Sequence, residues 1–259
     1  MEYLAVSALA LIQGLTEFLP VSSSGHLVIA QHLLGWNKAN ILLDAVLHLG
    51  TALAILVVFR KDIWELVTGL FSGNRIRRSG SIRYAVLLAI GTVPAALAGI
   101  LFRDFFEKAF SDPRSVAKLF FVSAAFLAAS AIRKTSAGKP ITAAKAGLIG
   151  LGQALAILPG VSRSGTTIST ALLVGTDRRE AGRFAFLLGL PGILGAAFLE
   201  IKDTPASSIA PGLLAVGFVI SFTVGTFTLR LLMRFVERGK ICYFAYYLVA
   251  LGLVCLLFL

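Results

Sequence analysis

Two stretches of this sequence decide its fold: residues 13–26 read QGLTEFLPVSSSGH, and residues 153–167 read QALAILPGVSRSGTT. Each interrupts an apolar segment with a proline and a serine-rich run, which predicts two half-helices that meet at a turn. A constant offset of 140 positions relates the two stretches and indicates an internal duplication. The matched pairs are Gln13 and Gln153, Leu15 and Leu155, Val21 and Val161, Ser22 and Ser162, Ser24 and Ser164, Gly25 and Gly165, and Gly35 and Gly175.

The composition places the rest of the chain in lipid. Hydrophobic residues make up 57% of the 259 residues and charged residues only 14%, and the mean hydropathy is +0.87, outside the range of soluble domains. A membrane span needs roughly 20 apolar residues, so six uninterrupted apolar runs predict six transmembrane helices. These runs are residues 41–59, 83–102, 116–132, 184–199, 212–232 and 241–259.

The order of these segments predicts an inverted repeat. Each half contains one broken helix pair followed by three spans, so the second half starts on the opposite side of the membrane. We therefore expect an all-α integral membrane protein in which six transmembrane helices accompany two broken, re-entrant helix pairs. Residues 1–259 form a single polytopic domain, with repeat halves at about 1–135 and 140–259.

The net charge of +11 is interpreted as a topology signal rather than as a nucleic-acid surface. Lys and Arg lie in short loops, and the loops on one predicted side carry most of them. That side is expected to be cytoplasmic, with both termini outside. The expected partners are membrane lipids and no nucleic acid, and a homodimer is left open.

The polar residues of the two breaks are expected to converge near the membrane midplane. Gln13 and Glu17 are four residues apart and share a helix face. An acid inside a membrane segment indicates a functional site, although Glu17 also fits a structural ion pair. The converging residues are Gln13, Glu17, Ser22, Ser23, Ser24 and His26 from the first break and Gln153, Ser162, Arg163, Ser164, Thr166 and Thr167 from the second.

Each serine run opens a new helix and offers hydroxyls, free backbone N–H groups and a positive dipole end, which together favour an anion. Plain helix capping is the alternative for either run alone. Arg163 supplies a planar fork suited to phosphate, and His26 is suited to proton transfer or nucleophilic attack. His48 stands alone on an apolar run and is expected to be packed or interfacial.

At these residues the sequence resembles the undecaprenyl pyrophosphate phosphatase family, also called the bacitracin-resistance proteins. The family's first motif has an acid or Gln ahead of a Glu and then a Ser-Gly-His turn, and its second corresponds to Pro159–Thr167. The resemblance implies a bacterial cytoplasmic-membrane phosphatase that uses Mg²⁺ or Ca²⁺, opens to the outer face and regenerates the lipid carrier of peptidoglycan synthesis. It implies functional roles for Glu17, Ser23, His26, Ser162, Arg163 and Thr167.

The expected reaction converts an isoprenoid pyrophosphate lipid to its monophosphate and inorganic phosphate. Glu17, Ser23, His26 and Arg163 are the candidate catalytic residues; either Ser23, activated by His26, or His26 itself attacks phosphorus, and the sequence does not decide between them. Glu17 is also the candidate metal ligand. A secondary transporter or lipid flippase is the alternative, since inverted repeats with broken helices are typical of transporters. The candidate substrate-binding residues are Gln13, Ser22, Ser24, Ser162, Ser164, Thr166 and Thr167.

Overall fold

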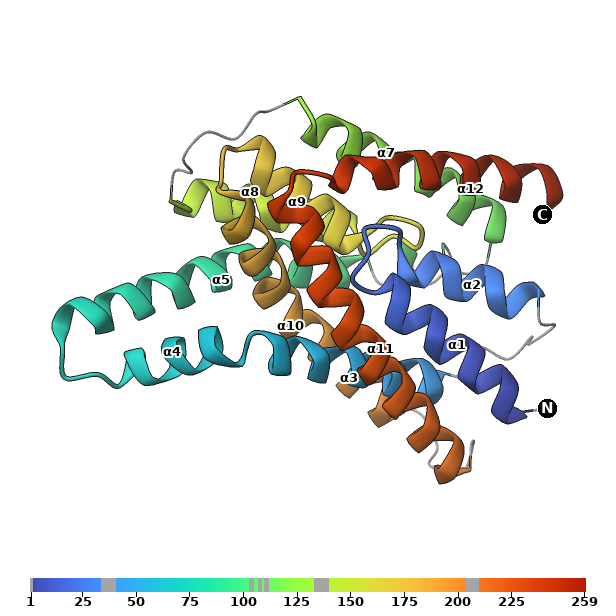
Figure 1. Cartoon of the computed structure of the whole chain (residues 1–259), viewed down its shortest axis with the longest axis horizontal. Helices are drawn as coiled ribbons and strands as arrows, with labels where there is room; N and C mark the ends of the chain where they lie inside the picture. The colour runs from blue at the N-terminus through green and yellow to red at the C-terminus, as the bar shows by residue number, and fades with distance from the viewer. Residues whose placement is uncertain are drawn as a thin grey trace.

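The computed structural model describes residues 2–33, 41–102, 105–106, 109, 112–132, 140–203 and 210–259, and every regular element in this part of the chain is a helix (Figure 1). The predicted all-α class is therefore confirmed. The elements are α1 (Glu2–Thr16), α2 (Ser23–Leu33), α3 (Ile41–Val58), α4 (Arg60–Leu70), α5 (Arg75–Leu101), α7 (Pro113–Ser130), α8 (Ala143–Leu155), α9 (Arg163–Leu173), α10 (Arg178–Asp203), α11 (Pro211–Glu237), a 3₁₀ turn (Ile241–Tyr243) and α12 (Phe244–Phe258).

The described part of the chain contains five helices that are long and apolar enough to cross a membrane, and the chain is a multi-pass membrane protein. The third predicted span, residues 116–132, corresponds to α7, which is not among these five. Arg114 and Lys118 lie in the first two turns of α7 and lower its hydropathy. The five candidate spans are Ile41–Val58, Arg75–Leu101, Arg178–Leu199, Pro211–Glu237 and Ile241–Phe258.

Both broken segments form the predicted pairs of half-helices. Residues 17–22 separate α1 from α2, and residues 156–162 separate α8 from α9. In each case a serine caps the second half-helix: Ser22 Oγ accepts a hydrogen bond from the backbone N–H three residues later (3.3 Å), and Ser162 Oγ does the same (3.1 Å). The duplicated sequence therefore folds into a duplicated cap.

The two turns place left-handed backbone at different positions. Ser22 has a φ of 69° and Gly160 has a φ of 98°, a region that is costly for residues other than glycine. A Cβ atom at Gly160 would lie 2.4 Å from the carbonyl oxygen of Val116 in α7, so only glycine fits there. The hydroxyl of Ser22 accepts a second hydrogen bond, from the N–H of Gly160 (3.1 Å), and so joins the two turns.

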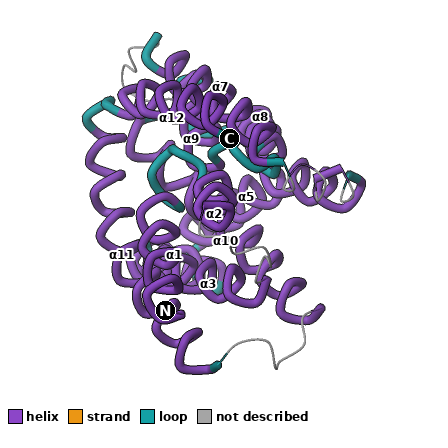
Figure 2. Tube along the Cα trace, turned by 90° about the vertical axis from the view of Figure 1, so that its right-hand side faces the viewer, coloured by secondary structure: helices purple, strands orange, loops and turns teal. Residues whose placement is uncertain are grey.

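The two breaks meet inside the bundle, where two loops lie among the helices in Figure 2. Ser164 Oγ donates a hydrogen bond to the carbonyl oxygen of Leu19 (3.3 Å). Ser123 of α7 bridges the second turn, since its hydroxyl donates to the carbonyl of Gly160 (3.1 Å) and accepts from the N–H of Ser162 (2.7 Å). The predicted convergence of the breaks is confirmed by these contacts.

Helices of the first half pack on helices of the second half. α1 packs against α11, α8 against α5, α3 against α10, and α7 against α12. Glycines permit the closest approaches: a Cβ atom at Gly14 would lie 2.9 Å from Cβ of Val224, and one at Gly150 would lie 2.3 Å from the carbonyl oxygen of Gly91. The two chain ends lie at the same end of the molecule (Figure 1).

Helix α4 was not predicted, and α5 begins at residue 75 rather than at 83. The basic residues before residue 83 were interpreted only as a loop signal. Asn74 caps α5, because its Oδ1 accepts from the N–H groups of Ile76 (3.0 Å) and Arg77 (3.2 Å). Gly69 lets α4 approach α5, and the resulting hairpin projects from the bundle on the left of Figure 1.

Candidate active site

Glu17 lies at the centre of the site, in the turn between α1 and α2. It is only 7% exposed, and its Oε2 accepts hydrogen bonds from Ser23 Oγ (2.6 Å) and from Gln13 Nε2 (3.0 Å). The predicted common face of Gln13 and Glu17 is confirmed by this bond. A buried carboxylate needs such donors, because an unpaired charge away from water is costly.

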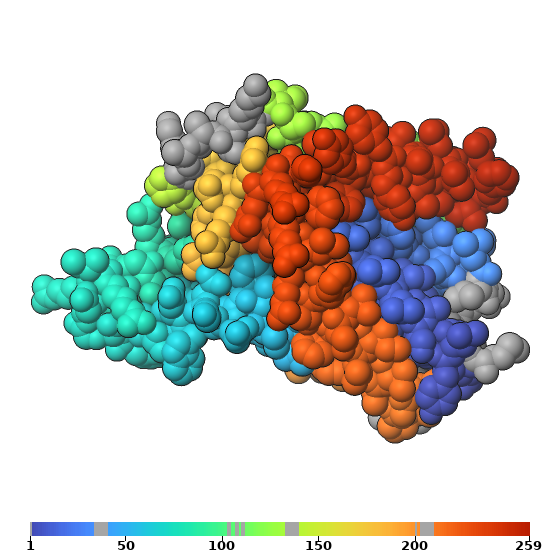
Figure 3. Space-filling model, viewed as in Figure 1, coloured from blue at the N-terminus to red at the C-terminus, as the bar shows by residue number. Residues whose placement is uncertain are grey.

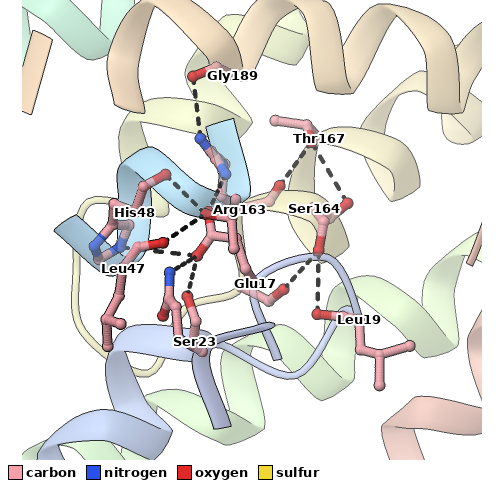
Figure 4. Close-up of polar contacts among 12 residues, drawn as sticks. Glu17, Leu19, Ser23, Leu47, His48, Arg163, Ser164, Thr167 and Gly189 are labelled. Atoms are coloured by element: carbon pink, nitrogen blue, oxygen red, sulfur yellow. Dashed lines mark hydrogen bonds and ion pairs between the residues drawn. The ribbon is translucent and has the colours of Figure 1, made fainter. Parts of the chain in front are cut away.

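Arg163, the first residue of α9, binds the other oxygen of the same carboxylate (Figure 4). Its Nη2 forms an ion pair with Oε1 of Glu17, and its Nη1 donates to the carbonyl oxygen of Gly189 in α10 (3.1 Å). A Cβ atom at Gly189 would lie 2.9 Å from Nη1, so glycine at this position makes room for the guanidinium. The arginine fork is therefore held between Glu17 and the α10 backbone.

Ser23 and Arg163 occupy equivalent places in the two halves. They are 140 positions apart, each is the first residue of its half-helix, and they bind the two oxygens of one carboxylate. Helix N-termini present free N–H groups and a positive dipole end, which favour a negative group. The Glu17 carboxylate thus lies between two helix starts of the kind that bind phosphate in other proteins.

His26 lies one turn into α2 and faces α12. Its Nδ1 is 2.8 Å from the carbonyl oxygen of Ser22, so Nδ1 carries a proton, and its Nε2 is 2.7 Å from the hydroxyl of Tyr247. The His26 and Tyr247 rings also stack, with centroids 5.8 Å apart. Among the described residues, the imidazole is therefore hydrogen-bonded to the Ser22 carbonyl and the Tyr247 hydroxyl, and not to Ser23.

The remaining serines form a matched pair of contacts. Ser24 Oγ lies 3.4 Å from Ser22 Oγ, and Ser164 Oγ lies 3.3 Å from Ser162 Oγ. Ser22, Ser162 and Ser164 are buried, whereas Ser24 is partly exposed. The four hydroxyls surround the two helix starts, where substrate binding was predicted.

Thr166 and Thr167 are fully buried in α9. Thr166 Oγ1 donates to the carbonyl oxygen of Ser162 (2.9 Å), and Thr167 Oγ1 donates to that of Arg163 (2.6 Å). Both hydroxyl protons are therefore used within the helix itself. A direct role in substrate binding stays a prediction for these two threonines.

Comparison with known proteins identifies the family of this chain. The sequence profile of the family described as Bacitracin resistance protein BacA matches residues 6–254. The chain belongs to the BacA family. An undecaprenyl-diphosphatase of Rubrobacter xylanophilus is 43% identical, over 97% of this chain and 96% of its own length. Proteins named undecaprenyl-diphosphatase from Corynebacterium jeikeium (40% identical; 98% and 93% covered) and Geotalea daltonii (38%; 100% and 99%) are similarly related.

Three residues of this BacA-family site were missed by the sequence analysis. His48 of α3 was expected to be packed or interfacial, but its Nε2 lies 3.8 Å from Oε2 of Glu17, and its Nδ1 lies 2.7 Å from the carbonyl oxygen of Asp44. Tyr247 and Gly189 are the other two. The rule that an ionisable group inside a membrane segment indicates function was applied to Glu17 and could have found His48. No local signal distinguished Tyr247 or Gly189.

The oxygen atoms of the site suit a divalent cation only together with a further ligand. Among the described residues, no group of three or more His, Cys, Asp or Glu side chains is placed so that it could hold a metal ion, and Glu17 is already paired with Arg163. However, Oε1 of Gln13 is buried without a hydrogen-bond partner. Mg²⁺ and Ca²⁺ prefer oxygen ligands, and Mg²⁺ is often bound by one or two carboxylates together with substrate phosphates. Glu17 and Gln13 therefore fit a cation that is shared with a phosphate group.

Proposed function

We propose that this protein hydrolyses undecaprenyl pyrophosphate to undecaprenyl phosphate and inorganic phosphate, and so recycles the lipid carrier of cell-wall synthesis and confers bacitracin resistance. One observation carries the proposal: in a BacA-family chain, Ser23 and Arg163 from two converging helix starts bind the two oxygens of one buried Glu17. The family membership and the names of relatives about 40% identical support the substrate.

Ser23 is the proposed nucleophile and Glu17 its base, because the hydroxyl of Ser23 already donates to Oε2 at 2.6 Å. The Ser23 oxygen bonds to the terminal phosphorus, the bond from that phosphorus to the bridging oxygen breaks, and undecaprenyl phosphate leaves. The Ser23 proton passes to Glu17, which hands it to the departing oxygen of undecaprenyl phosphate. Water then cleaves the phosphoserine: Glu17 takes one water proton and passes it to the Ser23 oxygen, and the other water proton stays on the released phosphate.

Direct attack by His26, which the sequence left open, is less well supported. The proton on Nδ1 leaves Nε2 as the nucleophilic nitrogen, and Nε2 is occupied by the hydroxyl of Tyr247. Attack would require the loss of this hydrogen bond. We assign His26 instead to the border of the site, where it contacts the bound substrate and stays fixed between Ser22 and Tyr247.

Arg163 and the helix starts provide charge stabilisation, which is most of what phosphoryl transfer requires. The guanidinium neutralises phosphate oxygens, aided by the hydroxyls of Ser22, Ser24, Ser162 and Ser164. A divalent cation held by Glu17 and by Oε1 of Gln13 would neutralise further phosphate charge when bound. Because Glu17 is ion-paired with Arg163, the incoming pyrophosphate has to take over part of this pairing.

The proposed setting is the bacterial cytoplasmic membrane, with six spans, an inverted repeat and a site open to the outer face. The helices of the two halves pack on each other reciprocally, α1 on α11 and α8 on α5, and this pattern supports the repeat. The common end for both termini and the clusters of basic residues in segments 60–83 and 230–240 support the orientation.

The test is phosphate release by the purified protein from undecaprenyl pyrophosphate in detergent. We expect release by the wild type and by Thr223→Ala, which removes an exposed hydroxyl of α11, and none by Ser23→Ala. If the wild type moves the lipid across vesicle membranes without releasing phosphate, the transporter alternative replaces the phosphatase.

A further inference from the structure

His48 of α3 lies beside the carboxylate of Glu17 (Figure 4). Its Nδ1 is 2.7 Å from the carbonyl oxygen of Asp44, so Nδ1 carries a proton and donates it to that carbonyl. Its Nε2 is 3.8 Å from Oε2 of Glu17. In the neutral ring, Nε2 therefore presents a lone pair toward the same carboxylate oxygen that accepts the hydrogen bond from Ser23.

The gap between Nε2 of His48 and Oε2 of Glu17 has the width of a bridging water. A distance of 3.8 Å is too long for a direct hydrogen bond, and two acceptors have no proton to share. A water placed roughly 2.8 Å from each atom would have the two acceptors about 85° apart, so it could donate one proton to each of them. The gap is therefore suited to a donor molecule with two protons.

Polar side chains lead to this gap from the α2 side of α3. Asp44 and His48 are four residues apart, so they share a face of α3, and both are partly exposed. Gln31 of α2 extends this face, because its Nε2 lies 3.2 Å from each carboxylate oxygen of Asp44. The three side chains therefore offer water a polar approach to Glu17.

The opposite face of α3 is closed by α11. Gly50 is two positions beyond His48, which turns it by about 200° around the helix axis. A Cβ atom at Gly50 would lie 2.8 Å from the carbonyl oxygen of Phe218, so the backbones of α3 and α11 are in close contact there. Helix α11 packs against both α1 and α3 and lies over them on the face shown in Figure 3. The approach to Glu17 is thus one-sided.

A water in the gap has a task in the second step of the proposed reaction. Ser23 Oγ donates to Oε2 of Glu17 at 2.6 Å. Once Ser23 carries the phosphoryl group, Oγ has no proton to donate, and Oε2 can accept from another donor. Oε2 contacts both the serine oxygen that holds phosphorus and the gap beside Nε2 of His48, so this donor lies next to the phosphoserine.

We propose that His48 is a positioning residue that holds the attacking water during cleavage of the phosphoserine, an inference that rests on the proposed function. The water donates one hydrogen bond to Nε2 of His48 and one to Oε2 of Glu17. Its oxygen bonds to phosphorus, and the bond from phosphorus to Ser23 Oγ breaks. The proton that faces Glu17 passes through this carboxylate to Oγ, and the other proton stays on the released phosphate. His48 aligns the water and takes no proton itself.

Timing the two steps separately tests this inference. Purified protein is mixed rapidly with undecaprenyl pyrophosphate labelled in its terminal phosphate, and a denaturing quench gives the lipid product, the released phosphate and the phosphate bound to protein. His48→Ala should form undecaprenyl phosphate in a burst of about one molecule per protein. It should accumulate phosphoserine at position 23 above the wild-type level and release phosphate about 10 to 100-fold more slowly. A general disturbance of the fold would slow both steps instead.

Two matched variants complete the test. His48→Gln should restore phosphate release to within about threefold of the wild type, because its amide oxygen reaches the place of Nε2 and accepts the same hydrogen bond without titrating. His32→Ala removes an exposed histidine of α2 and should change neither step. All variants are compared at wild-type gel-filtration profiles.

Three results overturn the role of His48 while wild-type turnover persists. In the first, His48→Ala slows both steps equally or slows neither. In the second, His48→Gln is as slow as His48→Ala, so that the imidazole acts by exchanging a proton. In the third, added Mg²⁺ or Ca²⁺ restores His48→Ala, so that the ring acts as a metal ligand. A wild type that forms neither product overturns the proposed function as well.

Discussion

The first break, residues 17–22, and the second, residues 156–162, are built on the same serine cap and supply different chemical groups. Where the first has Ser23, the second has Arg163, and the acid at Glu17 corresponds to Ile157. The first residue of each capped helix, Ser23 or Arg163, binds the carboxylate of Glu17. Duplication thus provides two helix starts that face one carboxylate, and divergence at a few positions separates the proposed nucleophile and base from the proposed charge stabilisation.

The largest effect should come from the first break. Ser23→Ala should reduce hydrolysis of undecaprenyl pyrophosphate about 10³-fold or more, because it removes the attacking oxygen. His26→Ala should keep measurable turnover. Rates are measured as phosphate release by variants with wild-type gel-filtration profiles. A trapped phosphohistidine at position 26, with substantial rate in Ser23→Ala, would assign attack to His26.

The second break should show a smaller loss. Arg163→Ala should lower the rate about 10² to 10³-fold, by analogy with the removal of one oxyanion donor. Arg163→Lys should recover little, because an ammonium cannot bridge both Glu17 and the carbonyl of Gly189. Phosphate release is again measured, on variants with wild-type gel-filtration profiles. Wild-type turnover in the lysine variant would show that the planar fork is not needed.

The shared carboxylate should control the response to metal. Chelation should abolish activity, and Glu17→Gln should need about 10 to 100-fold more Mg²⁺ or Ca²⁺ for its residual activity, because it removes the one acid of the site. Titration of activity with each cation provides the measurement. Unchanged turnover in chelator would leave Glu17 as a base and ion-pair partner only.

The turns should differ in their tolerance to substitution. Gly160→Ala should lower stability by about 1–3 kcal/mol, since alanine is strained at a φ of 98° and its Cβ meets the carbonyl of Val116. Ser22→Gly should cost less, because relief of strain at a φ of 69° offsets the lost hydroxyl. Thermal unfolding in detergent compares the two variants. A larger loss for Ser22→Gly would reverse this ranking.

The proposed inversion of the halves can be tested without measuring activity. Tyr3→Cys and Ala143→Cys place thiols at equivalent exposed positions, 140 residues apart, in a background lacking Cys242 and Cys255. In intact cells an impermeant thiol reagent should label position 3 and spare position 143 until the membrane is opened. Labelling of both positions from outside would mean that the halves are parallel.

The sequence predicted what depends on local chemistry and on the repeat. The broken helices, the caps and the Gln13–Glu17 contact follow from proline, serine and a spacing of four. The partners contributed by distant helices could not be predicted, because His48 and Tyr247 reach the site only through helix packing. Helix α4 was missed because its charged residues obscured an amphipathic pattern.

Ser22 also has a mechanical consequence. Its single buried hydroxyl accepts hydrogen bonds from its own cap and from Gly160 of the other half, beside the bond from Ser164 to the Leu19 carbonyl. A rocking movement of one half against the other, as in alternating-access carriers, would have to break these bonds and leave buried polar groups unpaired. We therefore expect this junction to keep Glu17, Ser23 and Arg163 aligned and to oppose carriage of the lipid through the protein.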